Sequence, residues 1–144
     1  MTNRMLFRSV AAAAVLAACA PALAQYDDPA DDMRYYGDRN GWQTIGRKSV
    51  NGQVDYDRIR VQGAERFRKL RVCSVDHPFE LREMSAEFAN GRRQQFMAGM
   101  IVRDGHCTHA FDLAGKRRNI DNIYLTYSRV GWGARRPQLI VQAR

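Results

Sequence analysis

Two histidines and a cysteine lie within the four-residue run 106–109 (HCTH), which is the residue chemistry of a metal site. Thiolate and imidazole both bind Zn²⁺, and a structural zinc site takes about four such ligands. Because alternate side chains of a strand share a face, Cys107 and His109 point the same way and His106 points away. The spacing therefore predicts no metal site. It predicts instead a partly buried, hydrogen-bonded His109.

Other arrangements typical of catalysis are incomplete. Cys107 and His109 lack the third group and the oxyanion-hole context that nucleophilic catalysis needs. Glu80 and Glu83 have opposite strand parity and lie among basic residues, which favours salt bridges over acid/base work. The glycines of 131–133 form no phosphate loop, because no helix is predicted after them. We predict no catalytic residues, no cofactor and no metal; a hydrolase or metal-dependent enzyme is the alternative.

Aromatic rings near arginines offer a third kind of site, a stacking platform for a ligand. The residues that would form it are Tyr124, Trp132 and Trp42, with Arg129, Arg135 and Arg136. Aromatic residues on strands more often belong to the core or cover its edges, so core packing is the expected role and the platform is the alternative.

The elements that must position these residues follow an apolar period of two from Trp42 onward, broken by Gly, Asn, Asp and Pro. This pattern is typical of antiparallel sandwiches and barrels. We predict strands at 43–50, 56–61, 67–74, 79–88, 94–103, 107–113, 123–128 and 138–142. The fold expected for residues 41–144 is a single all-β antiparallel β-sandwich, jelly-roll-like or a meander, of about eight strands.

Strand parity predicts how the central strands pair. A two-residue turn at Asp104-Gly105 would place the apolar sets of 94–103 and 107–113 on one face. The predicted pairs are Val102 with Cys107, Met100 with His109, Ala98 with Phe111 and Phe96 with Leu113.

The preceding hairpin needs a three-residue loop at 89–91 with Gly91 in a left-handed bulge. That loop pairs Phe88 with Arg92, Ala86 with Gln94 and Met84 with Phe96. Because Phe79 and Leu81 are out of phase with Met84, we predict a second bulge near Arg82 and Glu83. It would align Leu81 with Ala98 and Phe79 with Met100.

Cys73 and Cys107 could pair in an oxidising compartment. If the strands from 67 to 113 were neighbours in chain order, three spacings of about 4.8 Å would hold the cysteines about 14 Å apart. A disulfide needs Cα atoms within about 7 Å. The bond therefore requires residues 67–74 to lie in the opposite sheet.

The first 24 residues have the pattern of a secretory signal peptide: two arginines near the start, a short apolar run and Ala22-Leu23-Ala24. The run is too short to span a bilayer. We predict cleavage between Ala24 and Gln25 and a periplasmic or secreted protein. Alternatively, residues 16–19 (LAAC) form a lipobox, and a lipidated Cys19 anchors the protein.

Charge is distributed unevenly along the chain. Removing residues 1–24 takes away two of the 23 basic residues and none of the 15 acids, which leaves a net charge of +6. Five of those acids lie in residues 25–40, which have little apolar content and are predicted to form a flexible acidic arm. The basic remainder is explained either by solubility or by an anionic partner. Outside the cytoplasm the expected anions are envelope polymers and lipid headgroups, and nucleic acid is not expected.

The folded part contains a set of structural motifs: Trp42 and Gly46, with the runs 67–72 (FRKLRV), 88–91 (FANG), 111–115 (FDLAG), 118–120 (RNI) and 123–127 (IYLTY). With these residues the chain, from Trp42 to about Ala143, resembles a family of small exported bacterial proteins known only as a domain of unknown function. The resemblance implies an antiparallel β-sandwich outside the cytoplasm and carries no known activity. The function expected is a non-catalytic binding or structural module of the cell envelope.

Overall fold

The computed structural model describes residues 35, 37–131, 133 and 135–144. The predicted leader 1–24, residues 25–34 of the predicted arm and Trp132 lie outside these described residues. A helix with the length and hydropathy of a membrane span is not found among them.

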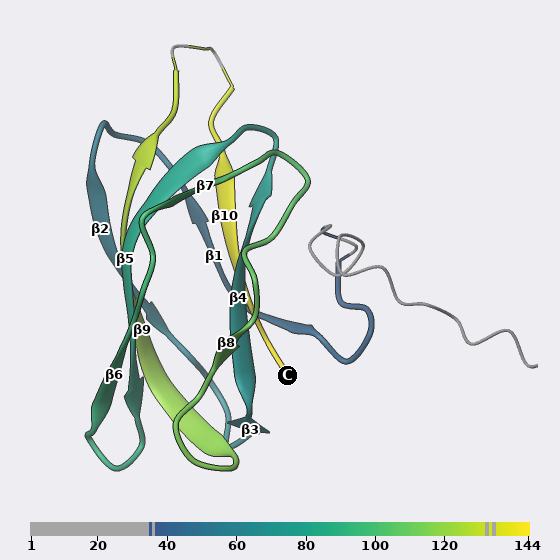
Figure 1. The fold of residues 1–144 in the computed structure, drawn as a ribbon, viewed down its shortest axis with the longest axis vertical. Coiled ribbons are helices and arrows are strands. Elements are labelled where there is room, and N and C mark those ends of the chain that lie inside the picture. Colours follow the sequence, from purple (N-terminus) through teal and green to yellow (C-terminus); the bar gives the residue numbers. More distant parts are fainter. Residues whose placement is uncertain (1–34, 36, 132, 134) are drawn as a thin grey trace, which may run out of the picture.

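The strands form two antiparallel sheets that face each other (Figure 1). The smaller sheet has the order β1 (Gln43–Ser49), β10 (Gln138–Ala143), β4 (Lys69–Val75) and β8 (Phe111–Asp112). The larger sheet has the order β2 (Asp55–Arg60), β9 (Arg118–Arg129), β5 (Phe79–Phe88) and β6 (Arg93–Phe96), with β3 (Arg66–Phe67) paired to β9 and β7 (Met100–Val102) to β5. The predicted all-β sandwich is confirmed, and the described residues form ten strands where about eight were expected.

The core lies between the sheets and is built by the predicted alternation. In β9, Ile123, Leu125 and Tyr127 are fully buried while the residues between them are half-buried. From the smaller sheet, Leu70 and Val72 of β4 face them, and neither is exposed. Burying each large apolar side chain contributes about 1.5–3 kcal/mol, so this layer is a substantial source of stability.

Gly46 lets the two sheets approach closely at one edge. It follows a bulge in β1, and a Cβ at this position would lie 2.4 Å from Cγ2 of Ile59 in β2. Any side chain here would force Ile59 or the backbone to move. This contact explains why a glycine occupies the position.

The hairpin from β5 to β6 has the predicted geometry. Gly91 has a left-handed φ of 78°, and the Phe88 N–H donates to the Arg92 carbonyl at 2.9 Å. The register pairs Ala86 with Gln94 and Met84 with Phe96, as expected from parity.

The predicted bulge in β5 also occurs, but the pairing of β5 with β7 differs from the predicted register. Pairing with β9 shifts between Leu81 and Glu83, so Arg82 is the extra residue of a bulge. The predicted alignment of Leu81 with Ala98 and Phe79 with Met100 is wrong. Leu81 pairs with Met100 and Phe79 with Val102, because residues 97–99 leave the ladder between β6 and β7.

The predicted hairpin between 94–103 and 107–113 is wrong. The turn itself forms, since the His106 N–H donates to the Arg103 carbonyl at 3.0 Å. It carries the chain to the other sheet, however, because β7 pairs with β5 and β8 pairs with β4. The two apolar sets meet across the core, where the rings of Phe96 and Phe111 lie 5.5 Å apart.

The predicted inward orientation of His109 is also wrong. His109 is exposed, and its ring packs against Phe111 at 4.4 Å between centroids. Thr108 is the buried neighbour, and its Oγ accepts from the Val72 N–H at 3.1 Å. The parity changes because residues 107–110 are not part of a continuous strand.

Cys73 and Cys107 lie directly opposite each other, with their Sγ atoms bonded. The condition for pairing is met because β4, which carries Cys73, lies in the sheet opposite β5. Both cysteines are buried beside Ile140 and Tyr35. The bond fixes the crossing from the larger to the smaller sheet.

Tyr127 is a buried tyrosine whose hydroxyl donates to the Asp57 carboxylate, which also lies 3.4 Å from Lys48 Nζ. Burial, and then the bond to Asp57, raise the pKa of Tyr127. The pKa of Tyr127 is therefore higher in the folded than in the unfolded protein. Its contribution to the free energy of unfolding is fully present below about pH 10. Above that pH the contribution decreases by about 1.4 kcal/mol per pH unit, because the tyrosine ionises in the unfolded chain.

We therefore expect Tyr127→Phe to cost about 1 kcal/mol at neutral pH and to remove this alkaline decline. Urea unfolding between neutral pH and about pH 11 measures both effects. Equal alkaline slopes in the two proteins would contradict the assignment.

Candidate functional site

The metal-binding residue types of the run 106–109 do not converge on a common site. The Cys107 sulfur is committed to Cys73, and His106 Nδ1 lies 2.8 Å from the backbone oxygen of Asp104. Within the described part of the chain, no group of three or more His, Cys, Asp or Glu side chains is arranged to hold a metal ion.

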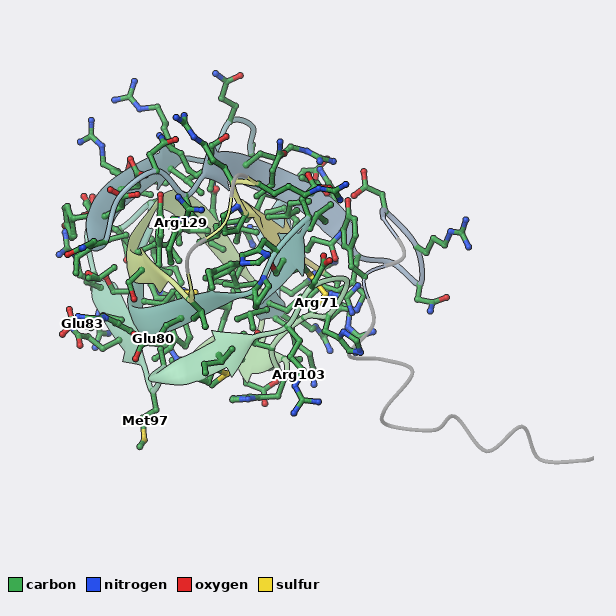
Figure 2. The ribbon with its side chains drawn as sticks, turned by 90° about the horizontal axis from the view of Figure 1, so that it is seen from above. Arg71, Glu80, Glu83, Met97, Arg103 and Arg129 are labelled. Carbon is green, nitrogen blue, oxygen red and sulfur yellow. A yellow bond between two sulfur atoms is a disulfide. The ribbon has the colours of Figure 1, made fainter. Side chains whose placement is uncertain are left out.

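Glu80 and Glu83 share the outer face of the larger sheet, which corrects the expectation of opposite parity. The bulge at Arg82 restores the phase, so Glu80 pairs with Ser128 and Glu83 with Thr126; Figure 2 shows both acids on the same side of the sandwich. The Ser128 hydroxyl (2.8 Å) and the Arg82 guanidinium (3.0 Å) donate to Glu80 and lower its pKa. Glu80 is thus a carboxylate held in hydrogen bonds.

Among the described residues, those of the alternative aromatic platform do not come together. Trp42 is 2% exposed and its ring contacts two guanidiniums, that of Arg71 at 4.3 Å and that of Arg144 at 4.5 Å. Tyr124 is on the outer face of the larger sheet, where it contacts Tyr56 instead. Trp132 is outside the described residues.

The predicted arginines of that platform shape a loop. Arg129 donates to the carbonyls of Gly133 and Arg135, and Arg136 donates to the Asn51 side chain at 3.1 Å. They hold the connection between β9 and β10 against the β1–β2 turn.

A cluster of cations lies at the end of the sandwich that is opposite the β1–β2 turn. This end carries β3 and is at the bottom of Figure 1. We name it the basic end, and its exposed members are Arg66, Arg68, Arg92, Lys116 and Arg117. Pairing of β3 with the start of β9 brings Arg66 opposite Asn119, two residues after Arg117. The Ala89 N–H donates to the Asn119 carbonyl at 3.0 Å, which ties the loop carrying Arg92 to the same end.

The basic end carries a cleft of about 420 Å³. Its lining includes the cations Arg66, Arg117 and Arg144, the apolar Phe67 and one acid, Glu65. The nearby Asp112 is paired with Lys69 at 3.3 Å. Within the described residues, none of the five members of the basic end makes an ion pair with a carboxylate.

Comparison with known proteins identifies the family but no activity. Residues 11–143 match the family described as Domain of unknown function (DUF2541). The chain belongs to the DUF2541 family. No curated protein and no solved structure shows a significant match to the chain. The resemblance to a family of unknown function is therefore confirmed.

The DUF2541 domain has a larger cleft, of about 540 Å³, at the end opposite the basic end. Its lining combines the charged Glu80, Arg82 and Arg129 with the β1–β2 turn at 51–53. Glu80 neutralises Arg82, and Arg129 is engaged by backbone carbonyls. The charged groups of this cleft are therefore already engaged, whereas the cleft at the basic end is lined by three cations and one acid.

Sequence reasoning missed the basic end as a location. The signal was present in two short runs, 66–69 (RFRK) and 116–118 (KRR), which are the densest clusters of cations in the folded part. Their meeting depends on the β3–β9 pairing, which joins residues about fifty positions apart.

Proposed function

We propose that this DUF2541 domain is a non-catalytic module of the bacterial cell envelope that binds an anionic envelope polymer through its basic end. The observation that carries the proposal is the gathering of five exposed cations at one end of the sandwich, where Arg66 and Arg117 line a cleft, without carboxylate partners among the described residues.

The chemistry of these cations suits a polyanion. Arginine presents a planar fork of donors that matches carboxylate and phosphate oxygens, and four of the five cations are arginines. Exposed charges of one sign attract a polymer mainly through counterion release and long-range steering, without a deep pocket. An open cleft flanked by such side chains fits an extended chain better than a small enclosed ligand.

The envelope location rests on the leader pattern of residues 1–24 and on the cysteine chemistry. A buried disulfide persists in oxidising compartments, which supports export. We propose the mature N-terminus at Gln25, with anchoring through Cys19 as the alternative. Mass spectrometry of the mature N-terminus distinguishes these two forms.

The non-catalytic assignment rests on how the candidate groups are engaged. The Cys107 thiol is consumed by the disulfide, and Glu80 is held as a carboxylate by Ser128 and Arg82. Neither is in a state suited to nucleophilic or general acid work.

We expect the mature protein to bind an acidic polysaccharide such as polygalacturonate with strongly salt-dependent affinity. If about four cations engage the polymer, raising NaCl from about 0.05 to about 0.5 M should weaken binding by about a thousandfold. Titration monitored by fluorescence anisotropy measures the slope of log Kd against log salt.

Neutral dextran is the control polymer and should not bind at any salt concentration. Binding that is absent at low salt, or that does not change with salt, would overturn the proposal. Selective binding to vesicles of anionic lipid, with no binding to the polysaccharide, would reassign the basic end to headgroups.

A further inference from the structure

The two outer faces of the sandwich differ in what covers them. On the smaller sheet, the fully buried Gln142 side chain donates to the Gly37 carbonyl at 2.8 Å. The Tyr35 N–H donates a hydrogen bond to the Gly105 carbonyl, also at 2.8 Å. The segment before β1 therefore packs over that face. On the larger sheet, no described segment packs over the outer face in this way, and Tyr56 is 66% exposed.

A shallow hollow of about 220 Å³ lies on this open face. We name it the tyrosine hollow, and its principal lining residues are Tyr56, Glu83, Ser85, Arg93, Gln95 and Tyr124. It exists because the central position on β5 is the small Ser85, which pairs with Tyr124 on one side and Gln95 on the other. Larger side chains on the flanking strands form its walls.

The aromatic wall of the hollow is held in place before any ligand arrives. The rings of Tyr56 and Tyr124 stack with their centroids 6.4 Å apart. The Tyr124 hydroxyl donates to Glu87 at 3.0 Å, and the Arg93 guanidinium lies 4.0 Å above the Tyr124 ring. Arg93 is in turn paired with Glu87 at 3.1 Å. Tyr56 is the ring left open to solvent, on a fixed support.

Two arginines lead from this hollow toward the basic end. In β2 the outward residues are Tyr56, Arg58 and Arg60, which pair with Thr126, Tyr124 and Asn122 of β9. Alternate residues of a strand are about 6.6 Å apart, so Arg60 lies about 13 Å beyond Tyr56. β2 runs down toward β3 in Figure 1, and neither arginine makes an ion pair within the described part of the chain.

We infer that the anionic polymer is a polysaccharide, with one sugar ring stacked on Tyr56 in the tyrosine hollow and acidic groups following Arg58 and Arg60 to the basic end. This inference rests on the proposed function and specifies its ligand. Apolar C–H faces of a sugar ring pack on an exposed aromatic ring, and its hydroxyls bond to nearby polar side chains.

The carboxylate of Glu83 makes the hollow selective for a sugar ring over a phosphate polyanion. At the rim of the hollow it would accept a hydrogen bond from a sugar hydroxyl, whereas it would repel a bare phosphate chain. Gln95 adds an amide that both donates and accepts. The hollow is thus suited to the C–H face and the hydroxyls of a sugar ring, and the β2 arginines to the acidic groups.

The test compares oligogalacturonate with inorganic polyphosphate of matched charge, using the mature protein at low salt. We expect Tyr56→Ala to weaken oligogalacturonate binding about tenfold and to leave polyphosphate binding unchanged. Tyr56→Phe should bind like the wild type, because the ring is retained. Val54→Ala, which alters an exposed apolar residue just before β2, is the matched control and should change neither affinity.

The outcomes distinguish this inference from the proposed function. If Tyr56→Ala leaves oligogalacturonate binding unchanged, or weakens the binding of both ligands equally, the inference that a sugar ring stacks on Tyr56 is wrong. The proposal that the basic end binds an anionic polymer is not affected by that result. If the wild type binds neither ligand at low salt, both proposals fail.

Discussion

Replacing both cysteines, in the variant Cys73→Ala/Cys107→Ala, is expected to lower the free energy of unfolding by about 4 kcal/mol. The bond joins residues 34 positions apart, and the loop that it closes contains all of β5, β6 and β7. In the chain-entropy account, releasing a loop of this length gives the unfolded chain much more freedom. Urea unfolding at neutral pH measures the loss.

The same bond can be removed from the wild type by reduction, which provides the control. A reductant should lower the urea midpoint of the wild type toward that of the double variant and leave the variant unchanged. Alanine is chosen because it removes the sulfur of the fully buried Cys73 without placing a new hydroxyl in the core. Equal stability of oxidised wild type and variant would show that the bond contributes nothing.

The second large effect is expected at the basic end. The triple variant Arg66→Gln/Lys116→Gln/Arg117→Gln should weaken binding to polygalacturonate about a hundredfold at low salt. Each cation near an anionic surface contributes about 1 kcal/mol, and a factor of ten corresponds to about 1.4 kcal/mol. The slope of log Kd against log salt should become shallower, because fewer counterions are released. All three side chains are exposed, so folding should be unaffected.

Local geometry was predictable from the sequence where one turn fixes one register. The glycine bulge at Gly91 and the break at Arg82 both follow from keeping Met84 and Phe96 on one face. The alternation of apolar residues could not show with which strand residues 107–113 pair. Strands of either sheet turn alternate residues toward the shared core, so the alternation is the same in both. Met100 and Phe111 therefore satisfied the predicted pattern while lying in different sheets.

The candidate sites were less accessible to sequence reasoning because they depend on contacts distant in the chain. Parity alone directs Tyr56 and Tyr124 outward, but their stacking requires β2 to lie beside β9. Net charge was compatible with an anionic partner or with solubility alone, and it did not show where the cations gather. The position of the basic end follows from the β3–β9 pairing, which places Arg66 opposite Asn119, two residues after Arg117.

The central claim is that the basic end, and not net charge, binds the polymer. A matched variant, Arg103→Gln/Arg135→Gln/Arg136→Gln, removes three exposed cations from the opposite end and so has the same net charge as the basic-end variant. The deciding measurement is the Kd of both variants for polygalacturonate at one low salt concentration. We predict that the basic-end variant binds at least about thirtyfold more weakly than the matched variant. Equal weakening of the two would contradict the account.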